Sequence, residues 1–296
     1  MKRSLQLGGM TIDLLPEIEH RMMPVSFLFD ALTREQMEAG SSWLDGRFLD
    51  PATMTLGLAF QAYVIRSEGL TILVDSCNGN HKQRPTAPWQ HDLRSNAFLD
   101  NLGRLGLRCE DVDIVVCTHL HCDHVGWNTR LDNGRWVPTF PNARHLFGRK
   151  EYDHFLGRFQ REGAAAVNHG AFVDSVLPVV DAGLAFFVDD GHVVVPGAEG
   201  EVSLMPAPGH SFGHCCVRAR ADGEEAIICG DALHHPIQLE LPDLRMRADL
   251  YPDVAIDTRR RLLAHCADTG AWLLAGHIPF HSIAQVRRFE DRFRFG

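Results

Sequence analysis

The stretch Thr118–Trp127, THLHCDHVGW, contains three histidines and one aspartate within six consecutive positions. It directly follows VDIVVC, an apolar and β-branched run that is typical of a buried strand. His119 and His121 are separated by one residue, so at the end of an extended strand both side chains point to the same side. Asp123 and His124 fall in the turn that follows, where they can face a neighbouring point. Imidazoles together with a carboxylate are ligands that zinc or another borderline divalent ion prefers.

Three further candidate ligands share one local setting, in which a polar residue stands beside a glycine after an apolar, strand-like run. They are His210 in MPAPGHSFGH, Asp231 in IICGDALHH and His277 in WLLAGHIPF. Loops at strand ends are where sites are usually assembled. The recurrence of this setting favours a metal centre over solvated loop histidines and an N-capping aspartate.

The bulk composition limits the class of protein. The chain has 296 residues, of which 45% are hydrophobic and 23% charged, and its net charge is -9. Its longest run of basic residues is the three arginines at 259–261, so a nucleic-acid partner, which needs an extended basic surface, is not expected. No stretch approaches the roughly 20 apolar residues of a membrane span, and the start lacks the apolar core of a signal peptide. The eight cysteines form no Cys-x-x-Cys pair, so we expect reduced thiols in a cytoplasmic protein without a membrane partner.

Strand-like runs flanked by helical periodicity recur in two similar halves, which predicts an α/β domain with the sheets inside. We expect a single domain over residues 1–296, with residues 1–55 as an extension that is helical and irregular apart from a short helix ending at Gly40. The expected strands cover 59–67, 70–76, 112–119, 191–197, 202–210, 214–220, 224–231 and, last, 271–277. The segment 143–156 is expected to be a strand followed by a helix, and further helices are expected over 95–107 and 258–270. The segment 78–92 is expected to be a loop.

At these residues the sequence resembles the metallo-β-lactamase superfamily. HLHCDH matches that family's His-x-His-x-Asp-His motif, and the three later ligand candidates match in order and context. The resemblance runs from about Ala59 to the C-terminus and implies a four-layer αββα sandwich of two mixed sheets flanked by helices, with the site at one edge. It also implies two divalent metal ions, most simply Zn²⁺. Their implied ligands are His119, His121 and His210 for one ion and Asp123, His124 and His277 for the other, with Asp231 bridging.

Two adjacent cations lower the pKa of a bridging water far enough to supply hydroxide near neutral pH. One cation can polarise a carbonyl or phosphoryl oxygen while the other takes up the developing alkoxide. The resemblance therefore implies a hydrolase in which Asp231 bridges the metals and Asp123, beside the hydroxide, collects its proton.

Within the superfamily, the sequence looks closest to the lactonase and methyl-parathion-hydrolase-like members, on the tail from GDALHHPIQLELPD to AGHIPF. Acyl-homoserine lactonases carry a tyrosine three positions after the bridging aspartate, where this chain has His234. That departure argues against homoserine lactone as the substrate. We expect opening of a lactone or cleavage of an ester, with aryl phosphotriesters as a possible side activity. His234 is the expected catalytic hydrogen-bond donor, unless it only orients Asp231, and His235 is a lesser candidate.

Other functions remain as alternative interpretations of the sequence. Asp231 argues against true β-lactamases, which lack that carboxylate, and the acidic net charge argues against nucleases. A glyoxalase II-like thioester hydrolase would need a basic cluster, for which RRFEDRFRF near the C-terminus is the candidate. A mononuclear-iron dioxygenase and a non-catalytic metal-binding protein are alternatives of another class, which metal analysis would separate from a dizinc hydrolase.

The substrate pocket is expected to be mostly apolar. Its expected lining residues are Trp127, Phe212, Leu233, His234 and Phe280, with Phe27 and Phe29 as further candidates from the N-terminal segment. Ser211 and His214 are expected to stabilise the loop around His210 and not to act as nucleophile and base. The segment GHSFG matches the letters of a Gly-x-Ser-x-Gly motif, but the strand-like run HCCVRAR follows it, where a serine nucleophile elbow needs a helix. In related lactonases an N-terminal extension helps to build dimers, so we expect a homodimer acting on a small ester or lactone.

Overall fold

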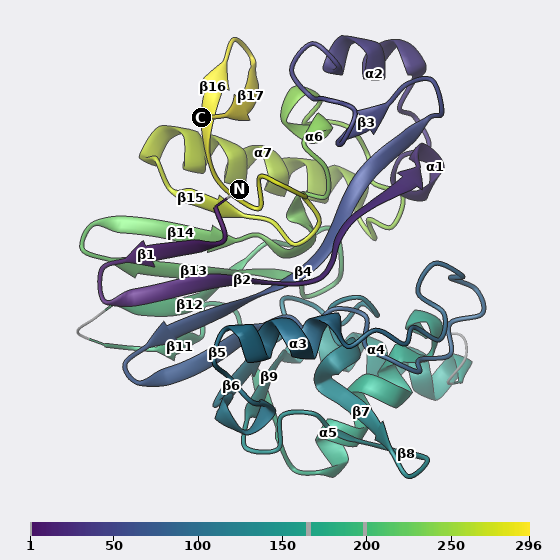
Figure 1. The fold of residues 1–296 in the computed structure, drawn as a ribbon, viewed down its shortest axis with the longest axis vertical. Helices are drawn as coiled ribbons and strands as arrows, with labels where there is room; N and C mark the ends of the chain where they lie inside the picture. The colour runs from purple at the N-terminus through teal and green to yellow at the C-terminus, as the bar shows by residue number, and fades with distance from the viewer. Residues whose placement is uncertain (1, 164–166, 198–199) are drawn as a thin grey trace.

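The computed structural model describes residues 2–163, 167–197 and 200–296, and two large sheets run through its middle (Figure 1). The first sheet has the strand order β1-β2-β4-β5-β6-β9-β10, with β3 paired to β4. Strands β1 to β5 pair antiparallel, whereas β5, β6, β9 and β10 run parallel. The bounds are β1 Ser4–Leu7, β2 Met10–Pro24, β3 Leu49–Asp50, β4 Thr55–Ser67, β5 Leu70–Val74, β6 Ile114–Val116, β9 Arg144–Gly148 and β10 Ala185–Val188.

The second sheet runs in chain order from β11 to β17, and its one parallel pair is β14 with β15. The bounds are β11 Val193–Val195, β12 Glu201–Pro206, β13 Cys215–Ala221, β14 Glu224–Ile228, β15 Trp272–Leu274, β16 Ile283–Phe289 and β17 Arg292–Phe295. A separate hairpin pairs β7, Thr129–Asp132, with β8, Arg135–Pro138.

Helices cover the outer faces of the two sheets (Figure 1). The helices α3, α4 and α5 lie beside the first sheet and α7 beside the second. The short helix α2 begins at a capping box, in which Thr33 and Gln36 exchange hydrogen bonds, and ends at Gly40 as predicted. The bounds are α1 Val25–Leu28, α2 Arg34–Gly40, α3 Ala97–Arg104, α4 Arg149–Glu162, α5 Leu177–Asp181, α6 Ile237–Glu240 and α7 Pro252–Thr269; the π-helix η5 is Phe172–Val176.

Three hydrophobic clusters fill the three interfaces between these layers. Val74 of β5 and Val217 of β13 belong to the cluster between the sheets. Phe98 of α3 and Val115 of β6 belong to the cluster between the first sheet and its helices. The third cluster joins Leu263 of α7 to the second sheet. Each fully buried aliphatic or aromatic side chain stabilises this packing by roughly 1.5–3 kcal/mol. The predicted αββα sandwich is confirmed.

Both ends of the chain differ from the expectation. Residues 1–55 were expected to be helical and irregular, but β1 and β2 are strands of the first sheet, and β2 is the long antiparallel neighbour of β4. The register of β2 shifts between Pro16 and Ile18 and again before Arg21, and these bulges interrupt the two-residue alternation that marks a strand. Whether residues 1–55 act as an extension of one domain stays a prediction.

The segment 271–277 is not the last strand, because the hairpin β16–β17 follows it. Arginines dominate the polar face of this hairpin, and Arg288 bonds Asp268 at 2.7 Å while Arg292 bonds Glu240. The many charged residues of the RRFEDRFRF segment therefore mask the alternation that would predict a strand. Two of its arginines are paired with carboxylates of this chain.

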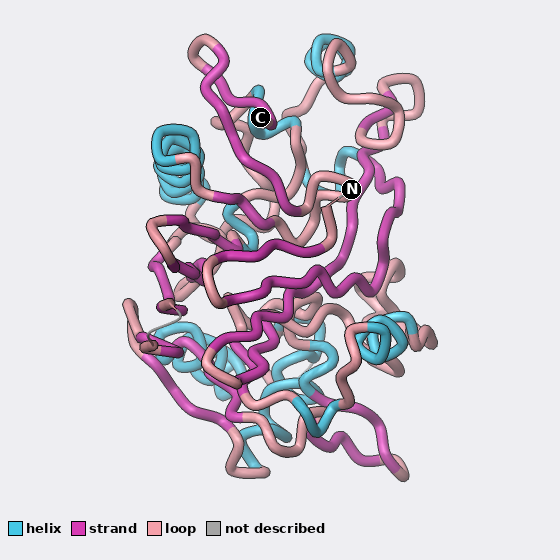
Figure 2. The backbone as a smooth tube through the Cα atoms, turned by 60° about the vertical axis from the view of Figure 1, so that its left-hand side comes forward, coloured by secondary structure: helices cyan, strands magenta, loops and turns pink. Residues whose placement is uncertain are grey.

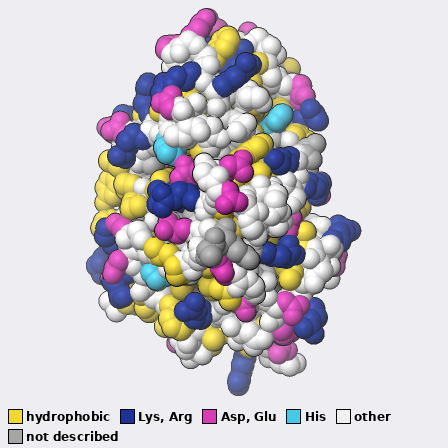
Figure 3. Space-filling view, turned by 90° about the vertical axis from the view of Figure 1, so that its left-hand side faces the viewer, with side chains coloured by type: hydrophobic (Ala, Val, Ile, Leu, Met, Phe, Trp, Pro, Cys, Tyr) yellow, Lys and Arg dark blue, Asp and Glu magenta, His cyan; other side chains and the backbone are white. Residues whose placement is uncertain are grey.

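Figure 2 shows the strands crossing the middle of the molecule, with loops gathered at the sheet ends. Within the described ranges, no helix has the length and apolar character that a bilayer crossing requires. On the face shown in Figure 3, the described acidic and basic side chains are interspersed and form no continuous basic tract.

Candidate metal centre

The seven predicted metal ligands lie in loops that follow four strands, one of the first sheet and three of the second. His119, His121, Asp123 and His124 follow β6; His210 follows β12, Asp231 follows β14, and His277 follows β15. Because β5 and β6 are parallel, and β14 and β15 are parallel, their carboxyl ends meet at one edge.

Glycines allow these loops to pack closely. Gly230, just before Asp231, has a φ of +49°, and a Cβ there would lie 2.6 Å from His214 Nε2 and 2.9 Å from Thr118 Oγ1. Gly209, just before His210, has a φ of +125°, and a Cβ there would lie 2.3 Å from the backbone nitrogen of Ala255. Any larger residue would move the ligand that follows it.

The first group of potential ligands is His119, His121, His210 and Asp231, whose donor atoms all lie within 4.8 Å of one another. The Nδ1 atom of His121 lies 2.9 Å from His210 Nε2. Asp231 Oδ2 lies 3.0 Å from His210 Nε2 and 3.6 Å from His119 Nε2. Four donors thus converge on one point.

The second group is Asp123, His124 and His277. The two imidazoles approach each other at 3.3 Å between their Nε2 atoms. Asp123 Oδ2 lies 4.0 Å from His124 Nε2 and 3.7 Å from His277 Nε2.

Asp231 touches both groups, because its second oxygen, Oδ1, lies 3.1 Å from His124 Nε2 and 3.0 Å from His277 Nε2. Burial raises the pKa of this carboxyl, but the surrounding imidazoles outweigh burial and hold the pKa well below its usual range. The carboxylate is therefore ionised and lies between the two groups.

Several donor atoms in the centre are buried without a hydrogen-bond partner among the described residues, including His119 Nε2 and Asp231 Oδ1. Buried polar atoms of this kind are costly unless something binds them. The nitrogen and carboxylate donors are those that zinc and related divalent ions prefer. The residues therefore fit a metal.

The remaining ring nitrogens of the histidines are held from outside the centre. Such contacts fix the orientation of a ligating histidine. The contacts are His124 Nδ1 to Asp75 Oδ2 at 2.8 Å, His210 Nδ1 to Asp249 Oδ1 at 3.0 Å, His277 Nδ1 to the Ala59 carbonyl at 3.0 Å, and His119 Nδ1 to Thr118 Oγ1 at 3.0 Å. Asp75 and Asp249 were not predicted, and only Asp75, at the end of an apolar run, had a signal in the sequence.

The electrostatics of the histidines divide them into two kinds. Burial lowers the pKa of His119 well below its ordinary value, and the neighbouring His124 adds to this effect. Burial also lowers the pKa of His210, but Asp231 and Asp249 outweigh it and raise the pKa to about 9. Protons held on such imidazoles occupy the lone pairs that a metal needs, so metal binding would release them.

Ser211 and His214 were predicted to support the loop around His210. His214 does so with both ring nitrogens, since Nε2 accepts from the Asp231 backbone N–H at 2.9 Å and Nδ1 contacts the Ala207 carbonyl at 2.8 Å. Burial lowers the pKa of His214 to about 3, which leaves it neutral and able to accept that bond. Ser211 lies in the cavity wall beside His210.

His234 is 2% exposed and lines the cavity, and its Nε2 lies 3.1 Å from Asp231 Oδ2. Burial lowers its pKa, so the imidazole is neutral at ordinary pH. His235 points away: its Nε2 contacts the Phe48 carbonyl at 2.8 Å and its Nδ1 accepts from the Ile237 N–H at 3.1 Å. Both nitrogens of His235 are thus used in structural bonds.

A cavity of about 930 Å³ opens above the centre, and both groups of ligands contribute to its wall. Of the predicted substrate contacts, Phe212 and His234 line it, and so does Phe27. All five residues of the segment 86–90, which precedes α3, line the cavity, and so do Phe60 and Met246; none of these was predicted. The unpredicted lining residues include Leu28, Leu58, Phe60, Ala87, Pro88, Trp89, Phe155, Met246 and Leu250.

Three predicted substrate contacts do not line this cavity. Trp127 is buried, donates its indole N–H to Glu17 at 2.6 Å and stacks on Phe98. Leu233 is fully buried in the cluster beside α7. Phe280 packs against Phe48 instead. Phe29 is likewise a buried core residue.

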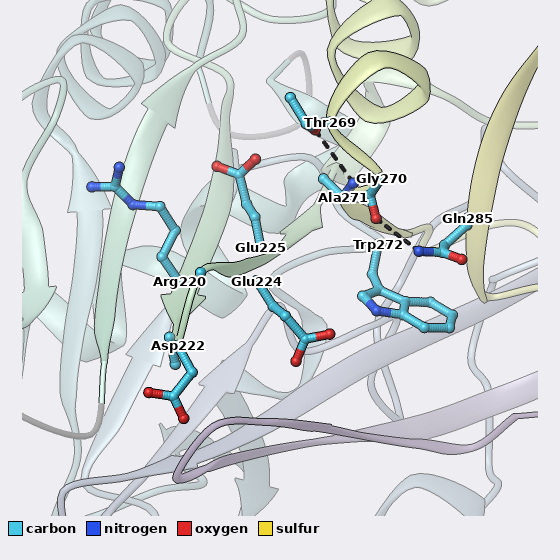
Figure 4. A pocket seen from close by; sticks show the side chains of 11 residues that line it. Arg220, Asp222, Glu224, Glu225, Thr269, Gly270, Ala271, Trp272 and Gln285 are labelled. Carbon is cyan, nitrogen blue, oxygen red and sulfur yellow. Dashed lines mark hydrogen bonds between the residues drawn. The ribbon is translucent and has the colours of Figure 1, made fainter.

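A second hollow, of about 680 Å³, lies between the β13–β14 turn and the α7–β15 turn (Figure 4). The side chains of Asp222, Glu224 and Trp272 line it, and Gln285 donates to the Gly270 carbonyl at 2.8 Å. None of the ligand groups found among the described residues lies there.

Comparison with known proteins gives curated relatives of low identity. A probable metallo-hydrolase of Mycobacterium tuberculosis is 26% identical over 146 residues, which are 48% of this chain and 44% of that protein. The N-acyl homoserine lactonase AttM of Rhizobium johnstonii is 25% identical over 193 residues, or 63% of this chain and 65% of that protein. The chain thus spans less than two thirds of the length of either relative.

Similar folds occur among solved structures. One is AidC, described as a dizinc quorum-quenching lactonase in complex with a product; it has a TM-score of 0.78, 17% identity, and coverage of 99% of this chain and 96% of that one. At this identity the likeness concerns the fold alone. The family model of the metallo-β-lactamase superfamily matches residues 61–284, which include every potential ligand of the centre. The chain therefore belongs to the metallo-β-lactamase superfamily.

Proposed function

We propose that this protein is a metal-dependent hydrolase that opens a lactone or cleaves a carboxylic ester. The observation that carries the proposal is the Asp231 carboxylate, whose two oxygens face two separate groups of potential ligands at the base of a mostly apolar cavity. His119, His121 and His210 would hold one divalent ion and Asp123, His124 and His277 the other, with Asp231 shared. Zinc is the ion that this donor set favours.

Two such ions, when bound, would supply a hydroxide nucleophile at neutral pH and would stabilise the negative charge that develops in the reaction. The chain's own residues supply orientation and proton handling. Asp123 is the partly exposed carboxylate of the centre, with 17% of its side chain accessible, so it is placed to accept a proton and pass it to solvent.

His234 is proposed as a hydrogen-bond donor to the carbonyl oxygen or to the leaving group. Its ring nitrogens are buried and have no hydrogen-bond partner among the described residues, although Nε2 lies close to Asp231. A neutral imidazole with an available N–H is suited to stabilise oxyanion charge. If His234 instead only orients Asp231, it makes the same contact with that carboxylate. Kinetic measurements on a His234 variant are therefore needed to separate the two roles.

The substrate class rests on the cavity and on the relatives. A lactonase is among the curated relatives, and the apolar wall suits an acyl group. Histidine at position 234, where acyl-homoserine lactonases carry tyrosine, argues for a lactone or ester other than a homoserine lactone, with aryl phosphotriesters as a side activity. A thioester of glutathione is disfavoured, because no arginine of the β16–β17 hairpin lines the cavity, and Arg288 and Arg292 bond Asp268 and Glu240.

The decisive experiment is turnover by purified protein of known metal content on lactones, aryl esters, thioesters and aryl phosphotriesters. Two zinc ions per chain and preferred turnover of lactones or esters are expected. A preference for thioesters would replace the proposal by a glyoxalase II-like activity, and one iron per chain with oxygen consumption would replace it by a dioxygenase.

We further propose that the protein is a cytoplasmic homodimer. All eight cysteines are free, which suits a reducing compartment. Size-exclusion chromatography with light scattering measures the mass directly, and a monomer of 33.1 kDa would contradict the dimer.

A further inference from the structure

The wall of the active-site cavity differs in charge from the rest of the chain. The protein carries 38 acidic against 29 basic residues, for a net charge of -9. Among the described residues that line the cavity, the only carboxylates are Asp123 and Asp231, both in the metal centre. The same wall contains two arginines, Arg158 and Arg247. A cationic wall on an acidic protein attracts an anionic ligand.

The two arginines are not equivalent. Arg158 forms a two-point bond with Glu162, with Nε to Oε1 at 3.1 Å and Nη2 to Oε2 at 2.7 Å. Arg247 has no carboxylate within 4.0 Å in the described part of the chain, and its Nη1 donates to the Ser26 carbonyl at 3.1 Å. The uncompensated positive charge of the cavity wall therefore belongs to Arg247.

The backbone around Arg247 is fixed relative to the metal centre. The Arg247 N–H donates to the Leu28 carbonyl at 2.7 Å, and three residues later the Leu250 N–H donates to the His210 carbonyl at 3.0 Å. Three residues span at most roughly 10 Å, so Arg247 lies within reach of a group a few bonds from the ester. Met246 and Phe60, in the same wall, provide apolar surface for the atoms between.

We propose that Arg247 binds an anionic group of the substrate, so that the preferred substrate is an ester or lactone whose apolar acyl part ends in a carboxylate or a similar anion. This inference rests on the proposed hydrolase function. Arginine forms strong, charge-assisted hydrogen bonds with carboxylates, so its loss should cost roughly tenfold in preference for the anionic substrate.

The test compares mono-4-nitrophenyl adipate, which carries a free carboxylate, with 4-nitrophenyl heptanoate, a neutral ester of similar length. The measured quantity is the ratio of kcat/KM for adipate to that for heptanoate, in wild type, Arg247→Gln and Arg245→Gln. Arg245 is a matched control, because it is exposed, pairs with Asp253 at 2.7 Å and does not line the cavity. We expect the ratio to exceed one in wild type and Arg245→Gln, and to fall roughly tenfold in Arg247→Gln.

An equal ratio in wild type and Arg247→Gln, or a wild-type preference for heptanoate, would overturn the inference. If neither ester is hydrolysed, the proposed function fails first. Calorimetric binding of monomethyl adipate to wild type and Arg247→Gln then tests Arg247 alone: weaker binding by the variant supports the anion site, and equal affinity refutes it.

Discussion

Removing the carboxylate of Asp174 should strongly destabilise the fold, because this side chain neutralises two buried cations. Arg84 is 1% exposed and bonds Asp174 at two points, with Nη1 to Oδ2 at 2.6 Å and Nη2 to Oδ1 at 2.8 Å. Lys82, also fully buried, lies 3.7 Å from Asp174 Oδ1 and donates to Thr129 Oγ1 at 2.6 Å. The cluster joins the loop after β5 to the π-helix η5.

The expected loss for Asp174→Ala is about 3–5 kcal/mol in the free energy of unfolding, which is the usual cost of leaving a buried charge unpaired. Two charge-assisted hydrogen bonds of about 1.5–3 kcal/mol each give an overlapping range, about 3–6 kcal/mol. By contrast, Asp253→Ala breaks an ion pair whose side chains are 64% and 84% exposed, and should change stability by less than about 1 kcal/mol.

Urea-induced unfolding followed by tryptophan fluorescence measures both variants against wild type. The reasoning fails if Asp174→Ala and Asp253→Ala have the same midpoint. Because Arg84 lies two residues before the segment 86–90 of the cavity wall, Asp174→Ala should also raise KM for the best substrate. An unchanged KM in a destabilised variant would confine the role of Asp174 to stability.

Three further predictions concern Asp231, His234 and Lys82. Asp231→Asn should lose most of its bound metal, measured by elemental analysis, together with its activity; a variant with full metal content would show that Asp231 is not a shared ligand. His234→Ala should keep its metals and lose roughly 100-fold in kcat/KM, and unchanged kcat/KM would leave His234 with an orienting role at most. Burial lowers the pKa of Lys82 to about 7 from an ordinary 10.5, so between these values the unfolded chain binds more protons and stability rises with pH. From pH 7 to 9 wild type should gain about 2 kcal/mol more than Lys82→Met, and parallel pH profiles of unfolding would contradict this.

The residues that the structure brings together at the centre could be predicted because their pattern is local. His119 and His121 stand out by their spacing directly after an apolar run, although the strand expected over 112–119 ends at Val116 and both histidines lie in the loop that follows. The later residues stand out by the repeated setting of a glycine after an apolar run. The layers could be predicted for a similar reason, since the buried strands of an α/β sandwich are short apolar runs. The bulged strand β2 and the arginine-rich hairpin β16–β17 lack that regular pattern, so both were missed.

The cavity wall was harder to predict, because proximity along the chain does not give the direction of a side chain. Trp127 follows the first motif closely, but its indole N–H donates to the buried carboxylate of Glu17 and its side chain does not line the cavity. Leu233 lies between Asp231 and His234, both of which line the cavity, and yet points into the core. Trp89 and Arg247 line the cavity from segments without helix or strand pattern, and only long-range contacts bring them there.

The two groups of potential ligands connect the two sheets, and this bears on the stability of the whole fold. His119, His121, Asp123 and His124 follow a strand of the first sheet, whereas His210, Asp231 and His277 follow strands of the second. Each group therefore draws donors from both sheets. A cation in either group would act as a cross-link between the two halves of the chain. A ligand that binds the folded state alone stabilises it, and the gain rises with the logarithm of its affinity. Opening the seam between the sheets and releasing the metals would then be a single event.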